Sequence, residues 1–233
     1  MMPTRRDFLI GLSFVLALAA SFTVDQPVAR LMAGNDAHVV AMSQFISWFG
    51  QGAVVLVPAG LITLAAIGLR FARPAAATRA DPVIARSAVI FATVAAAGIA
   101  NDLLKVVFGR ARPVLWLSGD DSGFGFFRYG AKVASFPSGH TATSVAAAIV
   151  LSALFPRWRP ELTLFACLIA ISRVAGGAHY PSDVIAGALV GGAVALAIVR
   201  QTGIRGLLYP PRQPGDAPQE SELAAVESKG NNH

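Results

Sequence analysis

Charged residues and cysteine are both scarce in this sequence, and each shortage excludes a class of protein. Only 14% of its 233 residues are Asp, Glu, Lys or Arg, whereas a soluble domain usually carries about a quarter. The single cysteine, Cys167, excludes an internal disulfide and a paired-cysteine zinc site, and we interpret it as a small apolar core residue. The net charge of +6 is not gathered in one basic tract, so nucleic acid is not an expected partner.

Apolar residues make up 55% of the sequence, and they occur in blocks rather than in a stripe of 3.6-residue period. Such blocks are typical of transmembrane helices. We therefore predict an all-α polytopic membrane protein with six transmembrane helices and both termini cytoplasmic. The expected spans are residues 8–24, 46–69, 87–107, 139–155, 160–175 and 184–199. Residues 1–209 would form one transmembrane domain, and the polar, proline-rich residues 210–233 a disordered cytoplasmic tail.

The placement of Lys and Arg predicts the orientation, because cytoplasmic loops are enriched in both. With the N-terminus inside, twelve of the nineteen Lys and Arg residues fall on the cytoplasmic side of the membrane. Of the seven on the outer side, four belong to three polar motifs and three do not. The start, Thr4–Leu9, is similar to a twin-arginine export signal with a cleavage site at Ala17–Ala19. We favour an uncleaved first helix, since six spans then place both ends inside. Residues 28–40 have helical spacing and predict an interfacial helix or a plain loop.

Three short polar stretches each lie at one end of an apolar segment. They are KVVFGRARP at Lys105–Pro113, PSGH at Pro137–His140 and SRVAGGAHYPSD at Ser172–Asp183. On the predicted topology all three face the outer side of the membrane. Together they bring cations, two histidines, a hydroxyl and a carboxylate to the level of the lipid head groups. This combination predicts a phosphoryl-transfer site.

Lys105, Arg112 and Arg173 are the candidate phosphate ligands. Lys and Arg at the ends of spans often reach toward lipid head groups, and that alternative would explain any one of them alone. Three on one face fit a phosphate better, because preset positive charge stabilises the equatorial oxygens during phosphoryl transfer. Arg110 could assist or could contact lipid phosphates, and we leave it outside the site.

The second stretch, Pro137–His140, opens the fourth expected span. The N-terminus of a helix has unpaired N–H groups and a partial positive charge, which suit an anion. Ser138 could donate its hydroxyl to a phosphate or cap the helix, and Gly139 would let the backbone approach the phosphate. Capping does not explain His140, whose imidazole would face the same outer surface.

His179 and Asp183 are four residues apart around the start of the sixth expected span. A carboxylate bonded to one imidazole nitrogen leaves the other nitrogen free to attack; alternatively, Asp183 only caps the helix. The other histidines, His38 and His233, lie away from the motifs, so we predict His179 as the nucleophile and His140 as the general acid and base. No acidic cluster on this face suits Mg²⁺ or Zn²⁺, and we predict no metal and no cofactor.

In order, the three stretches match the motifs Lys-x6-Arg-Pro, Pro-Ser-Gly-His and Ser-Arg-x5-His-x3-Asp, with every position filled. The chain thus resembles the type-2 phosphatidic acid phosphatase family, which includes glucose-6-phosphatase and, by a shared site, the vanadium haloperoxidases. The resemblance implies a six-helix membrane enzyme that removes phosphate from lipids without a metal. It implies phosphate contacts from Lys105, Arg112, Ser138, Gly139 and Arg173, and catalysis by His140, His179 and Asp183.

We therefore expect a lipid phosphatase in the bacterial inner membrane, acting at the periplasmic face on a lipid of the surrounding phospholipid bilayer. The family suggests undecaprenyl diphosphate, lipid A phosphate or phosphatidylglycerol phosphate as the substrate. A phosphotransferase using the same site, and a non-enzymatic transporter or lipid-binding protein, are the alternatives. Asp102 inside the third span would favour a transporter, but it precedes Lys105 by one turn, and a local pair is simpler. The sequence predicts no oligomeric state.

Overall fold

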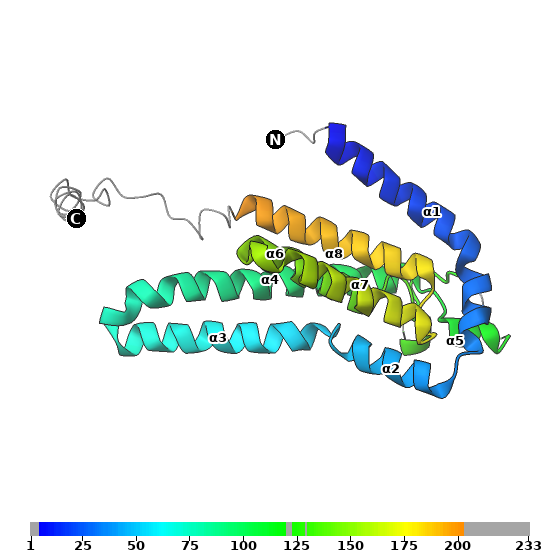
Figure 1. Cartoon of the computed structure of the whole chain (residues 1–233), viewed down its shortest axis with the longest axis horizontal. Helices are drawn as coiled ribbons and strands as arrows, with labels where there is room; N and C mark the ends of the chain where they lie inside the picture. Colours follow the sequence, from blue (N-terminus) through cyan, green and yellow to red (C-terminus); the bar gives the residue numbers. More distant parts are fainter. Residues whose placement is uncertain (1–4, 120–122, 129, 203–233) are drawn as a thin grey trace, which may run out of the picture.

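The computed structural model describes residues 5–119, 123–128 and 130–202, and these form helices joined mostly by short turns, with a longer segment between Leu117 and Gly139 (Figure 1). The helices are α1 (Arg5–Ala33), α2 (Ala37–Trp48), α3 (Gly52–Ala72), α4 (Ala77–Phe108), α5 (Pro113–Leu117), α6 (Gly139–Leu154), α7 (Arg159–Ala175) and α8 (Pro181–Gln201). Within these described ranges there is no strand, only an isolated bridge between Arg110 and Phe124. The fold is all-α, as predicted. The predicted tail at 210–233 and the first four residues lie outside the described residues.

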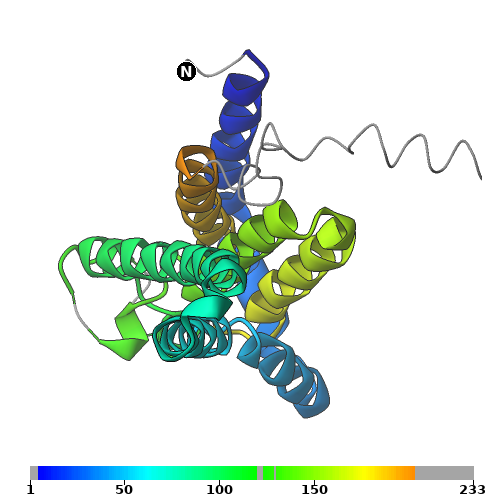
Figure 2. The same ribbon diagram turned by 90° about the vertical axis from the view of Figure 1, so that its left-hand side faces the viewer.

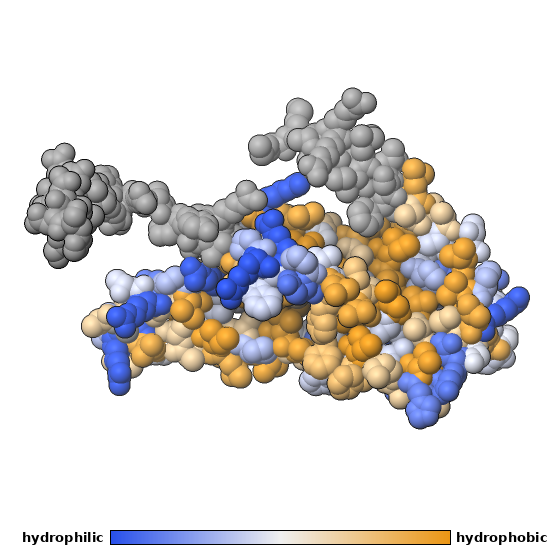
Figure 3. Space-filling model, in the orientation of Figure 1, coloured by the Kyte–Doolittle hydropathy of each residue, from blue (hydrophilic) through white to orange (hydrophobic). Residues whose placement is uncertain are grey.

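Three stretches of the described chain are long and apolar enough to cross a membrane. They are α2 and α3 taken together (Ala37–Ala72), α4, and α8, and α6 is a shorter apolar helix. Large apolar side chains such as Leu61, Leu103 and Leu164 are exposed on the outside of the bundle. Figure 3 shows apolar residues covering much of the visible face between clusters of hydrophilic residues. Six spans and the orientation of the termini stay predictions.

The bundle is centred on α6, which packs against α4, α7 and α8, while α3 pairs with α4 and α1 with α8 (Figures 1 and 2). The contact between α6 and α8 depends on small residues. A Cβ atom at Gly191 would lie 2.8 Å from the carbonyl carbon of Ala142, and one at Gly187 would lie 3.2 Å from that of Ser138. Two glycines four residues apart let helix backbones approach closely in membranes. This close approach places the start of α6 beside the start of α8.

The second expected span, residues 46–69, is not one continuous helix. Its helix breaks between Trp48 and Gly52, so α2 and α3 are separate. The carbonyl of Gly50 accepts a 2.7 Å hydrogen bond from the hydroxyl of Thr143 on α6, which holds the break against the centre of the bundle. The uncharged run gave no sign of this break, because the group that stabilises it lies in a distant segment.

Two other expectations about single segments are wrong. Residues 28–33 continue α1 to Ala33 instead of forming a separate surface helix or a loop. Pro27 lies inside α1, and the helix bends in its C-terminal half (Figure 1), as a proline that removes a backbone hydrogen bond would cause. Cys167 is exposed on α7 rather than buried in a core. In a helix that can face lipid, an apolar residue need not be buried by protein.

Candidate active site

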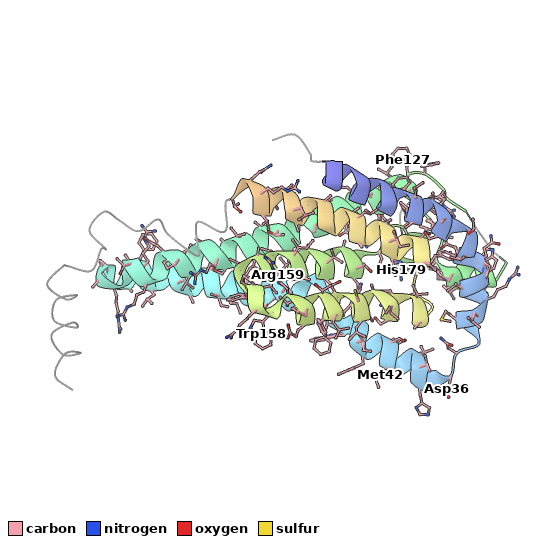
Figure 4. The ribbon with its side chains drawn as sticks, turned by 45° about the horizontal axis from the view of Figure 1, so that its top comes forward. Asp36, Met42, Phe127, Trp158, Arg159 and His179 are labelled. Carbon is pink, nitrogen blue, oxygen red and sulfur yellow. The ribbon has the colours of Figure 1, made fainter. Side chains whose placement is uncertain are left out.

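The three motifs meet at one end of the bundle. The first runs from the end of α4 to the start of α5, the second opens α6, and the third joins the end of α7 to the start of α8. Figure 4 shows His179 at the opposite end of α7 from Trp158 and Arg159. A Cβ atom at Gly139, next to His140, would lie 2.9 Å from Nζ of Lys105. Nη1 of Arg112 donates to the carbonyl of Ala178 at 3.5 Å, and the N–H of His179 donates to the carbonyl of Arg173 at 3.2 Å. The structure thus brings the predicted site residues into one neighbourhood.

Asp183 is the residue that ties the motifs together. Its backbone carbonyl accepts a 2.9 Å hydrogen bond from the N–H of Ser138, which joins the second motif to the third. Its carboxylate oxygen Oδ2 accepts hydrogen bonds from the N–H of Tyr180 at 2.9 Å and from the hydroxyl of Ser135 at 2.5 Å. The first of these bonds belongs to a capping box at the start of α8. Helix capping and contact with the histidine, which the sequence left as alternatives, therefore both occur.

His179 is nearly fully buried between α7 and α8, with its Nδ1 atom 3.4 Å from Oδ2 of Asp183. The contact is longer than a normal hydrogen bond, and catalytic hydrogen bonds often tighten only when substrate binds. Burial lowers the pKa of His179 below its usual value, although the nearby carboxylate of Asp183 acts to raise it. The imidazole is therefore neutral at pH 7, with Nδ1 turned toward the carboxylate. That is the form in which Nε2 can act as a nucleophile.

The three predicted phosphate ligands differ in how they are held. Nζ of Lys105 forms the predicted local pair with Asp102, at 3.0 Å. The guanidinium of Arg112 donates to the carbonyl of Ala131 at 2.8 Å through Nε, and burial lowers its pKa while the charge of Asp183 acts to raise it. In the part of the chain that the structure describes, Nε of Arg173 is buried without a hydrogen-bond partner. An anion between these groups would satisfy donors that the protein leaves available.

The start of α6 is open to an anion. Ser138 occupies the N-cap position, yet its side chain makes no capping hydrogen bond and instead accepts one from the hydroxyl of Thr141 at 3.0 Å. A Cβ atom at Gly139 would lie 2.9 Å from Nζ of Lys105, so glycine lets the lysine reach the backbone here. The first N–H groups of α6 and the lysine therefore face the same space, where the helix dipole also favours negative charge.

A cavity of about 510 Å³ borders these residues. Lys105, Gly139 and His140 line it at the motif end. The rest of its lining is mostly small or apolar, with Leu56, Val94, Ala95, Gly98 and Ile99, and it also includes Gln51 and Asp102. The break between α2 and α3 contributes Gly50 to the lining, and so this deviation from the predicted span opens the cavity wall next to His140.

Sequence reasoning missed four polar residues that contact or surround Asp183. Arg110, left outside the predicted site, donates a 2.7 Å hydrogen bond to Oδ1 of Asp183. Ser135 bonds the other carboxylate oxygen, and Asp25 and Ser182 bond Arg110. The position of Arg110 within the first motif was a signal, but Arg112 already filled the predicted role of phosphate ligand, and Arg110 could equally have contacted lipid phosphates. Asp25 had a weaker signal, as a lone acidic residue at the end of an apolar segment.

Among the described residues no group of three or more His, Cys, Asp or Glu side chains could hold a metal ion. Independence from metals stays a prediction, which activity in the presence of a chelator would test.

Residues 86–206 match the family model of the PAP2 superfamily. The match covers more than half of the chain and includes all three motifs. The chain belongs to the PAP2 superfamily. This confirms the family resemblance that the motifs predicted.

Known relatives agree with this membership. The lipid A 1-phosphatase of Rhizobium etli is 40% identical over 122 residues, which are 52% of this chain and 53% of that protein. The chain therefore spans about half the length of the curated relatives it matches. The crystal structure of the first transmembrane PAP2-type phosphatidylglycerolphosphate phosphatase from Bacillus subtilis has a TM-score of 0.58 at 19% identity, covering 84% of this chain and 96% of that chain. The crystal structure of Aquifex aeolicus LpxE has a TM-score of 0.50 at 22% identity, covering 76% and 95%. At these identities the two structures show a shared fold.

Proposed function

We propose that the chain is a lipid phosphatase that removes phosphate from a phosphomonoester or diphosphate head group through a phosphohistidine intermediate. The observation that carries the proposal is the cavity beside the motifs. Its lining includes Lys105 and His140, together with Asp102, which pairs with Lys105, and most of the other lining residues are small or apolar. A phosphate attached to a hydrocarbon chain has the same division of charge, with the phosphate at the cationic end and the chain along the apolar lining.

In the first step Nε2 of His179 attacks phosphorus and the bond from phosphorus to the lipid oxygen breaks. Asp183 favours the imidazolium that develops, because its carboxylate faces Nδ1. The negative charge of the bound phosphate offsets the cations around His140 and favours its protonated form. His140 then gives its proton to the leaving oxygen, which departs as the lipid alcohol or, from a diphosphate, as the lipid monophosphate. Lys105, Arg112 and Arg173 stabilise the charge that spreads over the three equatorial oxygens.

In the second step His140, now neutral, takes a proton from water while the water oxygen attacks the phosphohistidine. The bond between phosphorus and Nε2 breaks, inorganic phosphate forms, and His179 returns to its neutral state. The same cations act on this second transition state. Two histidines with separate tasks therefore account for both halves of the reaction.

The position of the arginines supports a site on the outer face of the membrane. Arg159 lies at the opposite end of α7 from His179 (Figure 4), and Arg70 pairs with Asp81 where α3 turns into α4. Because Lys and Arg are retained on the cytoplasmic side, the histidines would face the periplasm of a bacterial inner membrane. A lipid in the outer leaflet would then enter the cavity without crossing the bilayer.

Lipid A is the first substrate to assay, because a relative that is 40% identical over 122 residues is named a lipid A 1-phosphatase. Purified protein in nanodiscs should be compared on lipid A, undecaprenyl diphosphate and phosphatidylglycerol phosphate. We expect release of phosphate from at least one of them, with no release by His179→Ala. His38→Ala is the matched control, because His38 is exposed at the start of α2, and it should keep full activity.

Three results would contradict the proposal. Normal turnover by His179→Ala would exclude the nucleophile. Transfer of a labelled phosphoryl group to a lipid or sugar acceptor in place of water would identify a phosphotransferase. No release from any of the three lipids, by protein that is folded and inserted, would favour the transporter or lipid-binding alternative.

A further inference from the structure

Arg110 forms a buried bridge between two carboxylates. Its Nη1 atom donates to Oδ1 of Asp183 at 2.7 Å and to the hydroxyl of Ser182 at 2.6 Å. Its Nη2 atom donates to Oδ2 of Asp25 at 2.7 Å. Arg110 is only 7% exposed, so these bonds are protected from water. Buried ion pairs depend on hydrogen bonds to offset the loss of water, and this guanidinium donates three to the surrounding side chains.

Asp25 belongs to α1, far from the motifs in the sequence and outside the family match at residues 86–206. It is 1% exposed. Its carboxylate accepts three hydrogen bonds: from Arg110, from the N–H of Ser182 at 3.0 Å and from the hydroxyl of Ser182 at 2.5 Å. The carboxylate of α1 is therefore held at the first turn of α8, one residue from Asp183.

Aromatic rings confine the guanidinium of Arg110. Its Cζ atom lies 4.1 Å from the ring centroid of Tyr180, 5.0 Å from that of Phe124 and 5.4 Å from that of Phe22. Each ring is within the distance at which a cation is attracted to an aromatic face. Phe22 also comes from α1, one turn before Asp25. α1 thus supplies both a carboxylate and a ring to the bridge.

We propose that Asp25 and Arg110 are positioning residues for Asp183, so that α1 completes the catalytic unit of the PAP2 fold in this chain. The inference rests on the proposed role of His179 and Asp183. Arg110 binds Oδ1 and thereby turns Oδ2 toward Nδ1 of His179. Asp25 holds the other side of the guanidinium and balances its charge. The negative charge of Asp183 can then still stabilise the imidazolium form of His179.

The bridge predicts opposite electrostatic effects for its two members. The groups that face His179 are Asp183 on α8, Arg112 before α5, Arg173 on α7 and His140 on α6. Removing the negative charge of Asp25 leaves Arg110 to neutralise Asp183 more strongly, which disfavours protonated His179. Removing the positive charge of Arg110 has the reverse effect. Unit charges near one another in a protein interior interact strongly enough to shift a titration by about 0.5–1 pH unit.

The test measures kcat, KM and the acid limb of the pH profile for Asp25→Asn and Arg110→Gln on one lipid phosphate. We expect kcat to fall by about 10²-fold in each, as for small misplacements of catalytic groups, while KM changes little. The acid limb should move to lower pH in Asp25→Asn and to higher pH in Arg110→Gln. Arg110→Lys keeps the positive charge but loses the planar guanidinium that bonds two partners at once, so kcat should fall while the acid limb of the pH profile stays in place. Asn35→Ala is the control.

Asn35 follows α1 and donates a 2.9 Å hydrogen bond to the carbonyl of Ala175, so its loss loosens α1 without touching the bridge. It should change kcat by less than about threefold and leave the acid limb in place, since one neutral hydrogen bond is worth little. Wild-type kcat in Asp25→Asn and Arg110→Lys would overturn the inference. So would equal losses in all variants without any displacement of the limb, because a purely structural role has that result.

Histidine tautomers give a second readout that needs no substrate. In protein labelled with ¹⁵N-histidine, and assigned by comparison with His179→Gln, His179 should carry its proton on Nδ1 in the wild type. Asp25→Asn and Arg110→Lys should show a mixture of tautomers, and an unchanged Nδ1–H form in both would overturn the positioning role. If the wild type releases phosphate and the variants have the same kcat and pH profile, the positioning role is wrong but the proposed function is not. If the wild type releases none, the proposed function fails and the tautomers still test the bridge.

Discussion

Replacing Gly191 by alanine should separate α6 from α8 and reduce both stability and activity. The added Cβ atom would lie 2.8 Å from the carbonyl carbon and 2.9 Å from Cα of Ala142, and these are backbone atoms that cannot rotate away. Since ordinary contacts begin near 3.4 Å and the carbonyl oxygen is closer still, we expect the helices to move apart by roughly 1 Å. Overpacking of this kind costs about 1–3 kcal/mol.

The melting temperature of the purified protein measures the loss of stability. A cost of about 1–3 kcal/mol corresponds to a decrease of roughly 2–12 °C for a chain of this size. Activity should fall further than stability, because the same displacement stretches the bond from the N–H of Ser138 to the carbonyl of Asp183. A misplacement of about 1 Å in a catalytic site can reduce the rate by about 10²-fold.

Gly192→Ala is the matched control. A Cβ atom there would meet only the side chains of Ile149 and Val145, at 3.9 and 4.0 Å, which are ordinary contacts. It should melt within about 2 °C of the wild type and keep its activity, since surface or well-accommodated substitutions usually change stability by less than about 0.5 kcal/mol. Equal melting temperatures for Gly191→Ala and the wild type would refute the close-packing account of α6 and α8.

Three further predictions concern the site itself. Lys105→Met and Arg173→Met should each lower kcat/KM by about 10²–10³-fold, the usual effect of removing one donor from a charged transition state, and rates within tenfold of the wild type would contradict their role as phosphate ligands. Because burial lowers the pKa of His179, its ¹⁵N signals in ligand-free protein should titrate with a midpoint below 6.5. The imidazole is then already neutral at pH 6.5, and a midpoint above 6.5 would contradict a neutral nucleophile. Phosphate release should persist in EDTA and be inhibited by vanadate, which mimics five-coordinate phosphorus, whereas loss of activity in EDTA that Mg²⁺ restores would indicate a metal enzyme.

The sequence predicted the helical fold and the convergence of the motifs because both depend on local patterns. Apolar blocks indicate α4 and α8. Because successive helices run in opposite directions, the polar motifs at their ends are expected at the same end of the bundle. The spacing of His179 and Asp183 was enough to place both at the start of α8. A catalytic role can therefore be predicted for side chains that have a fixed spacing within one segment before a structure is known.

Contacts between distant segments could not be predicted in this way. The bond between Asp25 and Arg110 joins residues 85 positions apart, and nothing in either segment specifies the other. The break between α2 and α3 depends on Thr143 in α6, so an uncharged run was predicted as one span. Cys167 was expected in a core because the usual relation between apolar character and burial applies to water, not to lipid.

The account depends most on a covalent bond between phosphorus and His179. Protein mixed with ³²P-labelled substrate and quenched within milliseconds should carry a label that is stable in base and lost in acid, as a phosphohistidine is. The label should map to the peptide that contains His179 and should be absent from His179→Ala. A wild-type enzyme that turns over without any base-stable label, or with the label on another residue, would contradict the mechanism.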